Sequence, residues 1–399
     1  MSEPAARPML SGMSRSRFQL GAVLGVNQTL SWGMTFYLPA IVAGPAAESL
    51  GQTPFRVLGA FSWSLLVSAF FAPHVGRWID RHGGRGSLLA SVIVMAAGLA
   101  VLGVGQNLAF WFLGWTIIGA GMAMGLYDAA FATAGGLLGQ DAGPVITGIT
   151  LVAGFASTLF WTLGSLLIAS LGWRGLLLAY AGGMLLVNLP MVWLLVPPAP
   201  PRPRSAEVNG PRPPGHARTV ALVAGFFAVR WFLTSAIAVN VLDLFRGIGL
   251  SAAEAIGIAA LVGPSQVAGR IMEWLLGGRF GLLNRARVAA LLYPLGAVLL
   301  LAGGPYAAAG FAVLYGMSNG IMTINRGTLP LALFGAQGYA RILGWLAVPV
   351  QLAQAIAPSV TAPLVDMLTA QQVLLLSGAA AGVAALFLLP LRLPGKSRA

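Results

Sequence analysis

Runs of about twenty apolar residues recur along the whole 399-residue chain, separated by short segments of charged and turn-forming residues. Such a run is long enough to cross the ~30 Å hydrocarbon core of a bilayer as an α-helix. Only 8% of the residues are charged, whereas a soluble domain carries about a quarter. The sequence therefore predicts an all-α integral membrane protein with many spans.

Turn residues and charges divide the chain into about twelve predicted spans. These spans cover residues 18–44, 54–79, 87–105, 108–139, 144–170, 173–196, 219–246, 251–278, 288–304, 306–334, 340–368 and 371–391.

The basic residues predict the orientation of these spans. If the N-terminus lies inside, 17 of the 23 Lys and Arg residues lie on the inner side and only Arg56, Arg174 and Arg246 on the outer side. Cytoplasmic segments of membrane proteins carry an excess of Lys and Arg. We therefore expect both termini and the central loop to be cytoplasmic.

The central segment 197–218 is rich in proline and arginine and predicts an extended linker. A proline-rich motif that binds a partner is the alternative. The predicted domains are an N-terminal six-helix bundle, 1–196, and a C-terminal six-helix bundle, 219–399. Although the net charge is +13, the basic residues flank apolar runs and are not interleaved with aromatic residues, so nucleic acid is not an expected partner.

Two short matches indicate an internal duplication. Residues 76–80 and 269–273 both read Gly-Arg, two apolar residues and an acid, and GMAMG at 121–125 resembles GMSNG at 316–320. The two offsets, 193 and 195 residues, agree on nearly one register. Transporters built from repeats place their substrate near the membrane midplane between the repeats.

The stretch GRWIDRHGGRG at 76–86 concentrates charge between two apolar runs. Its glycines allow a tight turn and a close approach to a neighbouring helix. Asp80 can accept hydrogen bonds from a helix N-terminus or pair with arginines, which would make a breakable latch. The stretch resembles the major facilitator signature G-x-x-x-D-R-x-G-R-[RK], carried here by Gly76, Asp80, Arg81, Gly83 and Arg85, with Gly84 at the first basic position.

This resemblance, together with the span count and the repeat, covers nearly the whole chain. It implies the major facilitator fold, with about twelve transmembrane helices in two pseudo-symmetric six-helix bundles. It also implies a secondary transporter that works by alternating access and is not an enzyme.

Ionisable residues inside spans are costly and indicate function. Arg270 either holds a substrate or pairs with Glu273 three residues on, which lies on the same helix face. Arg326 is expected to face the cavity or to pair with Asp128. Arg230 is either functional or a snorkelling or structurally paired residue.

Neutral polar residues extend this set of candidates. In the family that the chain resembles, spans one, four, seven and ten line the cavity, which makes Gln28, Tyr127 and Asn325 candidate lining residues. Hydrogen bonding between helices is the alternative for each of them.

Several segments, among them YLPAIVAGPAAESLG and LGWRG, resemble bacterial relatives of the monocarboxylate porter group. That resemblance implies a carboxylate held by an eighth-span arginine, which Arg270 matches. Three buried arginines against few deep acids also favour an anionic substrate. We therefore expect a proton-linked carrier of a small organic anion in the bacterial inner membrane, with Asp128 and Glu273 as proton-coupling candidates.

The alternatives are an efflux transporter for drugs or metalloid or metal ions, and a receptor or scaffold without transport. Trp115 stands where drug–proton antiporters of the superfamily usually have an arginine. The chain has no cysteine, and its three histidines lack metal-ligand spacing. No cofactor or metal is expected, and the expected partners of a monomer are a small solute, protons and the bilayer.

Overall fold

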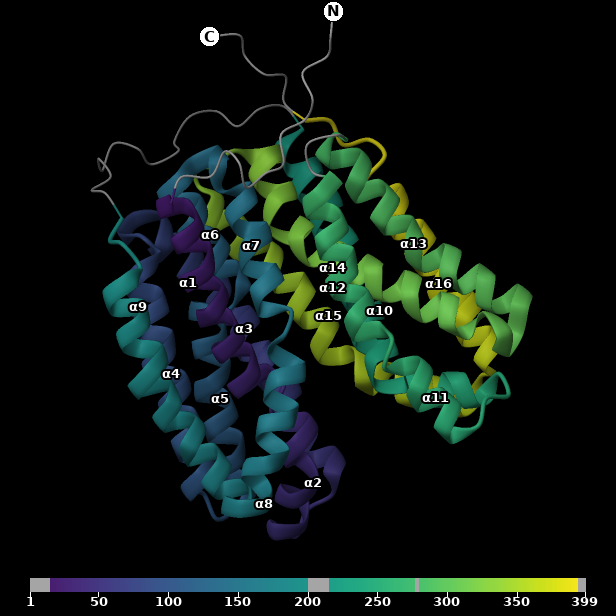
Figure 1. The fold of residues 1–399 in the computed structure, drawn as a ribbon, viewed down its shortest axis with the longest axis horizontal. Helices are drawn as coiled ribbons and strands as arrows, with labels where there is room; N and C mark the ends of the chain where they lie inside the picture. Colours follow the sequence, from purple (N-terminus) through teal and green to yellow (C-terminus); the bar gives the residue numbers. More distant parts are fainter. Residues whose placement is uncertain (1–14, 200–214, 277–279, 394–399) are drawn as a thin grey trace, which may run out of the picture. The chain divides into compact units, whose positions relative to one another are not determined.

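The computed structural model describes residues 15–199, 215–276 and 280–393, and within them every regular element is a helix (Figure 1). Close contacts group these helices into two compact units. The N-terminal unit contains residues 15–199 together with 335–355, and the C-terminal unit contains residues 215–334 and 356–393.

The N-terminal unit is a helical bundle in which α3, α4 and α5 pack side by side (Figure 1). Its helices are α1 (Arg15–Ser31), α2 (Pro39–Ser49), α3 (Pro54–His82), α4 (Gly84–Val104), α5 (Leu108–Gly125), α6 (Tyr127–Leu138), α7 (Gly143–Ala153), α8 (Ala156–Gly183), α9 (Leu189–Leu195) and the first part of α15 (Tyr339–Met367). Two π-helical segments, Trp32–Phe36 and Met184–Asn188, and one 3₁₀ turn, Gly139–Ala142, complete it.

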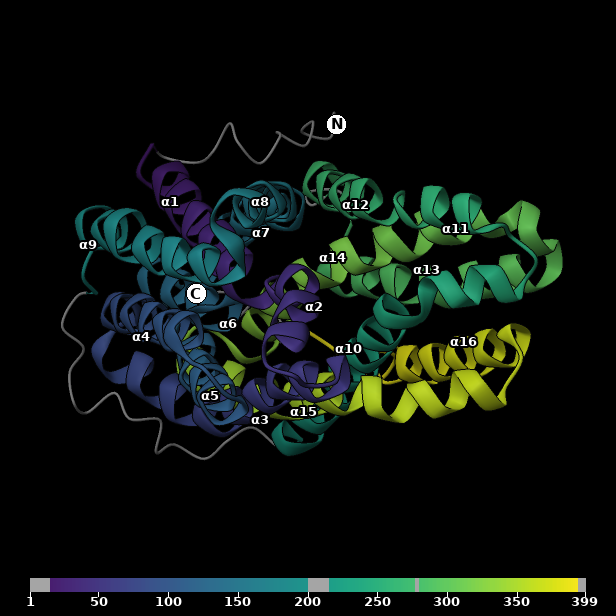
Figure 2. The same ribbon diagram turned by 90° about the horizontal axis from the view of Figure 1, so that it is seen from below.

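The C-terminal unit is a second bundle, in which α13 packs against both α14 and α16 (Figure 2). Its helices are α10 (His216–Gly247), α11 (Ala252–Ala259), α12 (Val262–Leu276), α13 (Leu282–Gly303), α14 (Ala308–Phe334), the remainder of α15, and α16 (Ala370–Leu386). A 3₁₀ turn, Gly304–Ala307, joins α13 to α14.

The predicted membrane helices are present. Seven helical stretches of the described chain are long and apolar enough to cross a membrane. Two of them, Leu108–Leu195 and Leu282–Phe334, hold several predicted spans each, and α16 is a shorter apolar helix. The first predicted span is divided among α1, a π-helical segment and α2. The prediction of an all-α membrane protein is therefore confirmed.

Some boundaries differ from the predicted ones. Helix α13 begins at Leu282, ahead of the predicted residue 288, and α10 begins at His216, inside the predicted linker. Most of that linker, residues 200–214, lies outside the described residues. Because α15 divides its length between the two units, the assignment of all of 219–399 to one bundle remains a prediction.

Helix ends follow local sequence rules. Thr53 caps α3 by accepting a hydrogen bond from Arg56 N at 3.4 Å, and Pro54 occupies the first helical position. Ser251 and Glu254 form a reciprocal capping box at the start of α11. Gly83 and Gly172 have φ values of +81° and +70°, which glycine adopts without strain, and they mark turns between predicted spans.

Several interruptions inside spans were not predicted. The backbone is extended at Leu126, between α5 and α6, and the helix also breaks between α11 and α12. Two π-helical segments, Trp32–Phe36 after α1 and Met184–Asn188 after α8, interrupt the first and the sixth predicted spans, and residues 154–155 separate α7 from α8. Polar residues such as Asn27 and Asp128 lie near these points, but the length of the apolar runs alone does not locate the interruptions.

Glycines bring the second and fourth spans of each unit into close contact. A Cβ on Gly119 of α5 would collide with the Ser64 carbonyl oxygen of α3. In the C-terminal unit, a Cβ on Gly316 of α14 would lie 2.6 Å from the Val262 carbonyl oxygen of α12. Small residues let membrane helices approach in this way.

The matched glycines of the predicted repeat make different contacts. Gly121 and Gly125 of the N-terminal unit pack on Met95 and Ser91 of α4, the third span, whereas Gly316 and Gly320 pack on α12, the eighth. The register of the glycine match is therefore wrong at residue level, because it is Gly119 that takes the place facing the second span.

Candidate functional site

Asp80 lies near the end of α3 and caps the start of α15. Its Oδ1 accepts a hydrogen bond from Ala340 N at 3.2 Å, and its Oδ2 accepts one from Arg341 N at 2.8 Å. These amides belong to the first turn of α15, where backbone N–H groups lack helical partners and the helix dipole favours an anion. Of the two kinds of partner that the sequence allows for Asp80, a helix N-terminus is one that it contacts, within the N-terminal unit.

The glycines of the signature allow this approach. A Cβ on Gly76 would collide with the Ala340 carbonyl oxygen, and a Cβ on Gly84 would collide with Thr133 of α6. Gly83, with its positive φ, ends α3 and would meet Ala199 if it carried a Cβ. Any larger residue at these places would push neighbouring segments apart.

The two signature arginines behave differently. The Arg85 guanidinium donates to the Trp193 carbonyl oxygen at 2.5 Å, which holds the end of α9. Arg81 is exposed. The signature therefore brings Asp80 into contact with the start of α15 and Arg85 into contact with the end of α9.

Gln28 joins α1 to the break between α5 and α6. Because Ala129 N bonds to Leu126 O rather than to Gly125 O, the break leaves the Gly125 carbonyl without its helical donor. Gln28 is fully buried, and its Nε2 donates to that carbonyl at 2.7 Å. Of the two readings that the sequence leaves open for Gln28, this contact favours bonding between helices.

A polar network extends from Gln28 to the sixth span. Gln28 Nε2 also donates to Asn27 Oδ1 at 3.0 Å, and Asn27 Nδ2 donates to Asn188 Oδ1 at 2.9 Å. Asn188 Nδ2 donates to Ser31 Oγ at 3.2 Å. Asn188 is not among the residues predicted from the sequence, although an amide inside the apolar run LLVNLPMVW is a signal that could have found it.

Tyr127 and Asp128 begin α6 directly after the break. The Tyr127 ring lies 4.8 Å from the Trp32 ring and stacks on Phe131. Asp128 is partly buried in the first turn of α6, where the helix dipole favours a carboxylate.

Arg230 of α10 is buried, with 2% of its surface exposed, among neutral groups. Its guanidinium donates to Asn319 Oδ1, Ser318 Oγ and Thr234 Oγ1 at 2.5, 3.1 and 3.3 Å. The guanidinium carbon lies 5.4 Å from the centre of the Tyr293 ring and 6.0 Å from that of Tyr315. No carboxylate is among these partners, so neutral dipoles and aromatic faces alone support the charge.

Arg326 and Asn325 of α14 differ in accessibility. Arg326 is partly exposed, and its guanidinium carbon lies 5.2 Å from the centre of the Trp231 ring on α10. Asn325 is fully buried, and within the described residues neither atom of its amide has a hydrogen-bond partner. Of these two candidate lining residues, Arg326 is the accessible one.

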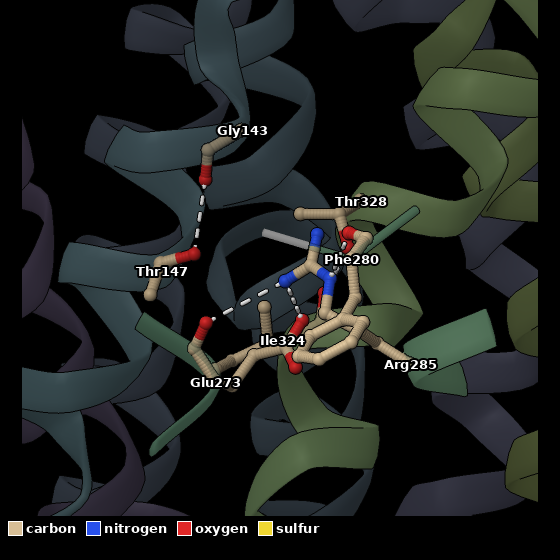
Figure 3. Close-up of polar contacts among 7 residues, drawn as sticks. All are labelled: Gly143, Thr147, Glu273, Phe280, Arg285, Ile324 and Thr328. Carbon is tan, nitrogen blue, oxygen red and sulfur yellow. Dashed lines mark hydrogen bonds and ion pairs between the residues drawn. The ribbon is translucent and has the colours of Figure 1, made fainter. Parts of the chain in front are cut away.

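Arg270 and Glu273 lie on α12, and both are buried. Glu273 forms an ion pair with Arg285 of α13, and Arg285 Nε also donates to the Phe280 carbonyl oxygen at 3.1 Å (Figure 3). From the sequence, Arg285 is only one of the 17 basic residues predicted on the inner side. The reason for the difference is spatial, since α13 starts early enough to bring Arg285 beside α12.

Three charged side chains of the described residues are buried. They are Arg230, Arg270 and Glu273, and Glu273 is paired with Arg285. Across residues 15–199, 215–276 and 280–393, no group of three or more His, Cys, Asp or Glu side chains gathers as metal ligands would.

Comparisons with known proteins identify the family. Residues 23–358 match the model of the Major Facilitator Superfamily. No curated protein matches the chain.

Solved structures share the fold at low sequence identity. The human organic anion transporter MFSD10 (TETRAN) aligns with a TM-score of 0.74 and 15% identity, over 97% of this chain and 100% of its own. The E. coli fucose:proton symporter FucP aligns with a TM-score of 0.72 and 16% identity, over 94% and 98%. The proton:xylose symporter XylE aligns with a TM-score of 0.67 and 15% identity, over 94% of each chain.

The matched family model spans most of the chain, and the solved structures share its fold over nearly the full length. Members of this family bind small solutes and move them across a membrane, and they are not enzymes. The chain belongs to the Major Facilitator Superfamily and is a secondary transporter.

Proposed function

We propose that this transporter carries a small, monocarboxylate-like organic anion, coupled to protons. The supporting observation is Arg230, whose charge is buried and has only neutral partners. A buried charge without a counter-ion is costly. An anionic ligand that reaches the Arg230 guanidinium would compensate its charge. Arg326 supplies a second guanidinium, which is partly exposed.

The likeness to a human organic anion transporter agrees with an anionic substrate, although at 15% identity it bears on fold alone. We propose that both termini are cytoplasmic, because of the distribution of basic residues. A monomer in the bacterial inner membrane is part of the same proposal. Alternating access arises from movement between the two predicted bundles. A relationship of this transporter to the monocarboxylate porter group is part of the same proposal.

Proton coupling is assigned to Asp128. Glu273, the other candidate, forms an ion pair with Arg285. An acid that gains and loses a proton as the cavity opens to either side would link proton movement to substrate movement. Replacing Asp128 by asparagine should abolish accumulation driven by a pH gradient while exchange of substrate persists.

The test of the anion proposal is uptake by proteoliposomes of labelled small monocarboxylates under an inward proton gradient. Arg230→Gln should reduce uptake by about tenfold or more, since a hydrogen bond to a charged group contributes about 1.5–3 kcal/mol. The matched control is Arg56→Gln, because Arg56 is exposed and its guanidinium donates to Gln52 Oε1, four residues earlier in the chain, at 3.2 Å. Unchanged uptake by the correctly inserted Arg230 variant would contradict the proposal.

A further inference from the structure

Four aromatic side chains of the N-terminal unit form a cluster that the proposed function does not use. The aromatic patch consists of Trp32, Phe36, Tyr37 and Tyr127, and each of these side chains is partly buried. Trp32 is its centre, with ring centroids 4.5 Å from Phe36, 4.8 Å from Tyr127 and 6.0 Å from Tyr37. All three rings are tilted relative to Trp32, and Tyr127 also stacks on Phe131.

The indole of Trp32 is held in place from the protein interior. Trp32 Nε1 donates to Gln28 Oε1 at 3.1 Å, and the Gln28 amide nitrogen is bonded to Gly125 O and Asn27 Oδ1. Gln28 therefore has both ends of its amide occupied by the protein. It acts on a ligand only through Trp32, as a positioning residue.

Asn188 orients this arrangement from the sixth span. It bonds Asn27 on one side and Ser31 on the other, and Ser31 directly precedes Trp32. Both residues that it holds are at most 1% exposed. A fully satisfied buried network of this kind specifies one geometry.

Two helix distortions coincide at the patch. Trp32 and Phe36 are the ends of a π-helical segment, and Tyr127 follows the extended residue Leu126. π-Helical segments are frequent at functional sites, and transporters bind substrate at interrupted helices. Here both distortions turn aromatic rings toward the same place, and the buried carbonyl that the break leaves at Gly125 accepts a hydrogen bond from Gln28 instead of from a ligand. What remains for a ligand is aromatic surface.

We propose that the aromatic patch is a subsite for the planar ring of an aromatic monocarboxylate, with Asn188 and Gln28 as positioning residues for Trp32. The inference rests on the proposed function, since it adds a ring to the anion proposed there. Offset and edge-to-face packing of a flat ring on Trp32 and Tyr127 supplies the selectivity.

The experiment measures binding to the full-length protein in nanodiscs by titration calorimetry. The probes are benzoate, cyclohexanecarboxylate of similar size but without a planar ring, propionate, and benzyltrimethylammonium. Benzoate should bind about tenfold more tightly than cyclohexanecarboxylate, which is the size of effect that aromatic packing provides.

Three variants locate the effect. Trp32→Leu should lower benzoate affinity to that of cyclohexanecarboxylate and leave propionate affinity unchanged. Asn188→Leu should likewise lower benzoate affinity and leave propionate affinity unchanged. Asn188→Gln, which keeps the amide, should retain part of the benzoate affinity that Asn188→Leu loses. The matched control is Trp63→Leu, because Trp63 is also an indole bonded to a side chain, Thr116, at 2.9 Å.

The outcomes separate the two proposals. If carboxylates bind but benzoate has no advantage, or its advantage survives Trp32→Leu, the subsite is wrong and the proposed function stands. If none of the carboxylates binds, the proposed function fails and the subsite with it. Preference for benzyltrimethylammonium over every carboxylate would overturn both in favour of a cationic substrate.

Discussion

The acids Asp80 and Glu273 occupy matching places in the two halves of the sequence but have different partners. Asp80 caps backbone amides at the start of α15. Glu273 is buried and forms an ion pair with Arg285 on the next helix of its own unit. A carboxylate on backbone amides can leave without exposing a buried opposite charge, whereas separation of the Glu273 pair would strand one. The Asp80 contact therefore suits a reversible latch, and the Glu273 pair suits a permanent tie.

The arginines that follow these acids are more alike. Arg85 at the start of the third span holds the Trp193 carbonyl near the end of the sixth. Arg287 at the start of the ninth span donates to the carbonyls of Leu388, Leu389 and Leu391 at the end of the twelfth. In both halves, therefore, an arginine binds carbonyls near the end of the last span of that half. The halves differ in the partner of the acid.

The largest loss of stability should come from breaking the ion pair between Glu273 and Arg285. Glu273→Gln leaves Arg285 without its counter-charge, and loss of one partner of a buried pair costs about 3 kcal/mol or more. Thermal unfolding in detergent should show a clear loss of stability. The double variant Glu273→Gln/Arg285→Gln should recover much of that loss, and failure to recover would show that the pair is not the cause.

Substitution of the glycines near each acid should separate stability from transport. A Cβ on Gly269 would lie 2.6 Å from the Met317 carbonyl oxygen of α14, within the C-terminal unit, so Gly269→Ala should destabilise the protein by about 1–3 kcal/mol. Gly76→Ala acts instead on the contact with α15 at Ala340. We expect it to change the transport rate more than the unfolding temperature. Equal effects of the two variants on both measurements would contradict the distinction.

The smallest effect on stability should come from the latch itself. Asp80→Asn keeps an acceptor for the α15 amides but removes the charge, and a charge at a helix N-terminus contributes about 0.3–1 kcal/mol. The expected result is a slower turnover rate with unchanged substrate affinity, measured by uptake kinetics and binding. A normal turnover rate would show that the contact is structural only.

Local patterns were sufficient for much of this description. Apolar run lengths predict the spans, and glycine marks the turns at Gly83 and Gly172 because only glycine adopts their positive φ values without strain. The spacing of Gly76, Asp80 and Gly83 predicts a close helix contact around a carboxylate. These features depend on residues that are neighbours in the chain.

Long-range partners were not predictable in the same way. Asn188 meets Asn27 across 161 positions in sequence, and no local pattern names that partner. Glu273 was weighed against Arg270 on its own helix, but its ion pair is with Arg285. The choice depends on where α13 begins and how it packs, which the apolar pattern leaves uncertain by several residues.

The sequence by itself determined the class of protein, because a chain so apolar and so poor in charge can bury its runs only as membrane helices. The tertiary structure alone decided which polar groups meet. In an apolar surrounding each buried donor and acceptor needs a partner, and helix packing brings these partners together from distant parts of the chain. That is why Asp80 meets α15, Gln28 meets Gly125, and Arg230 is left with neutral neighbours only.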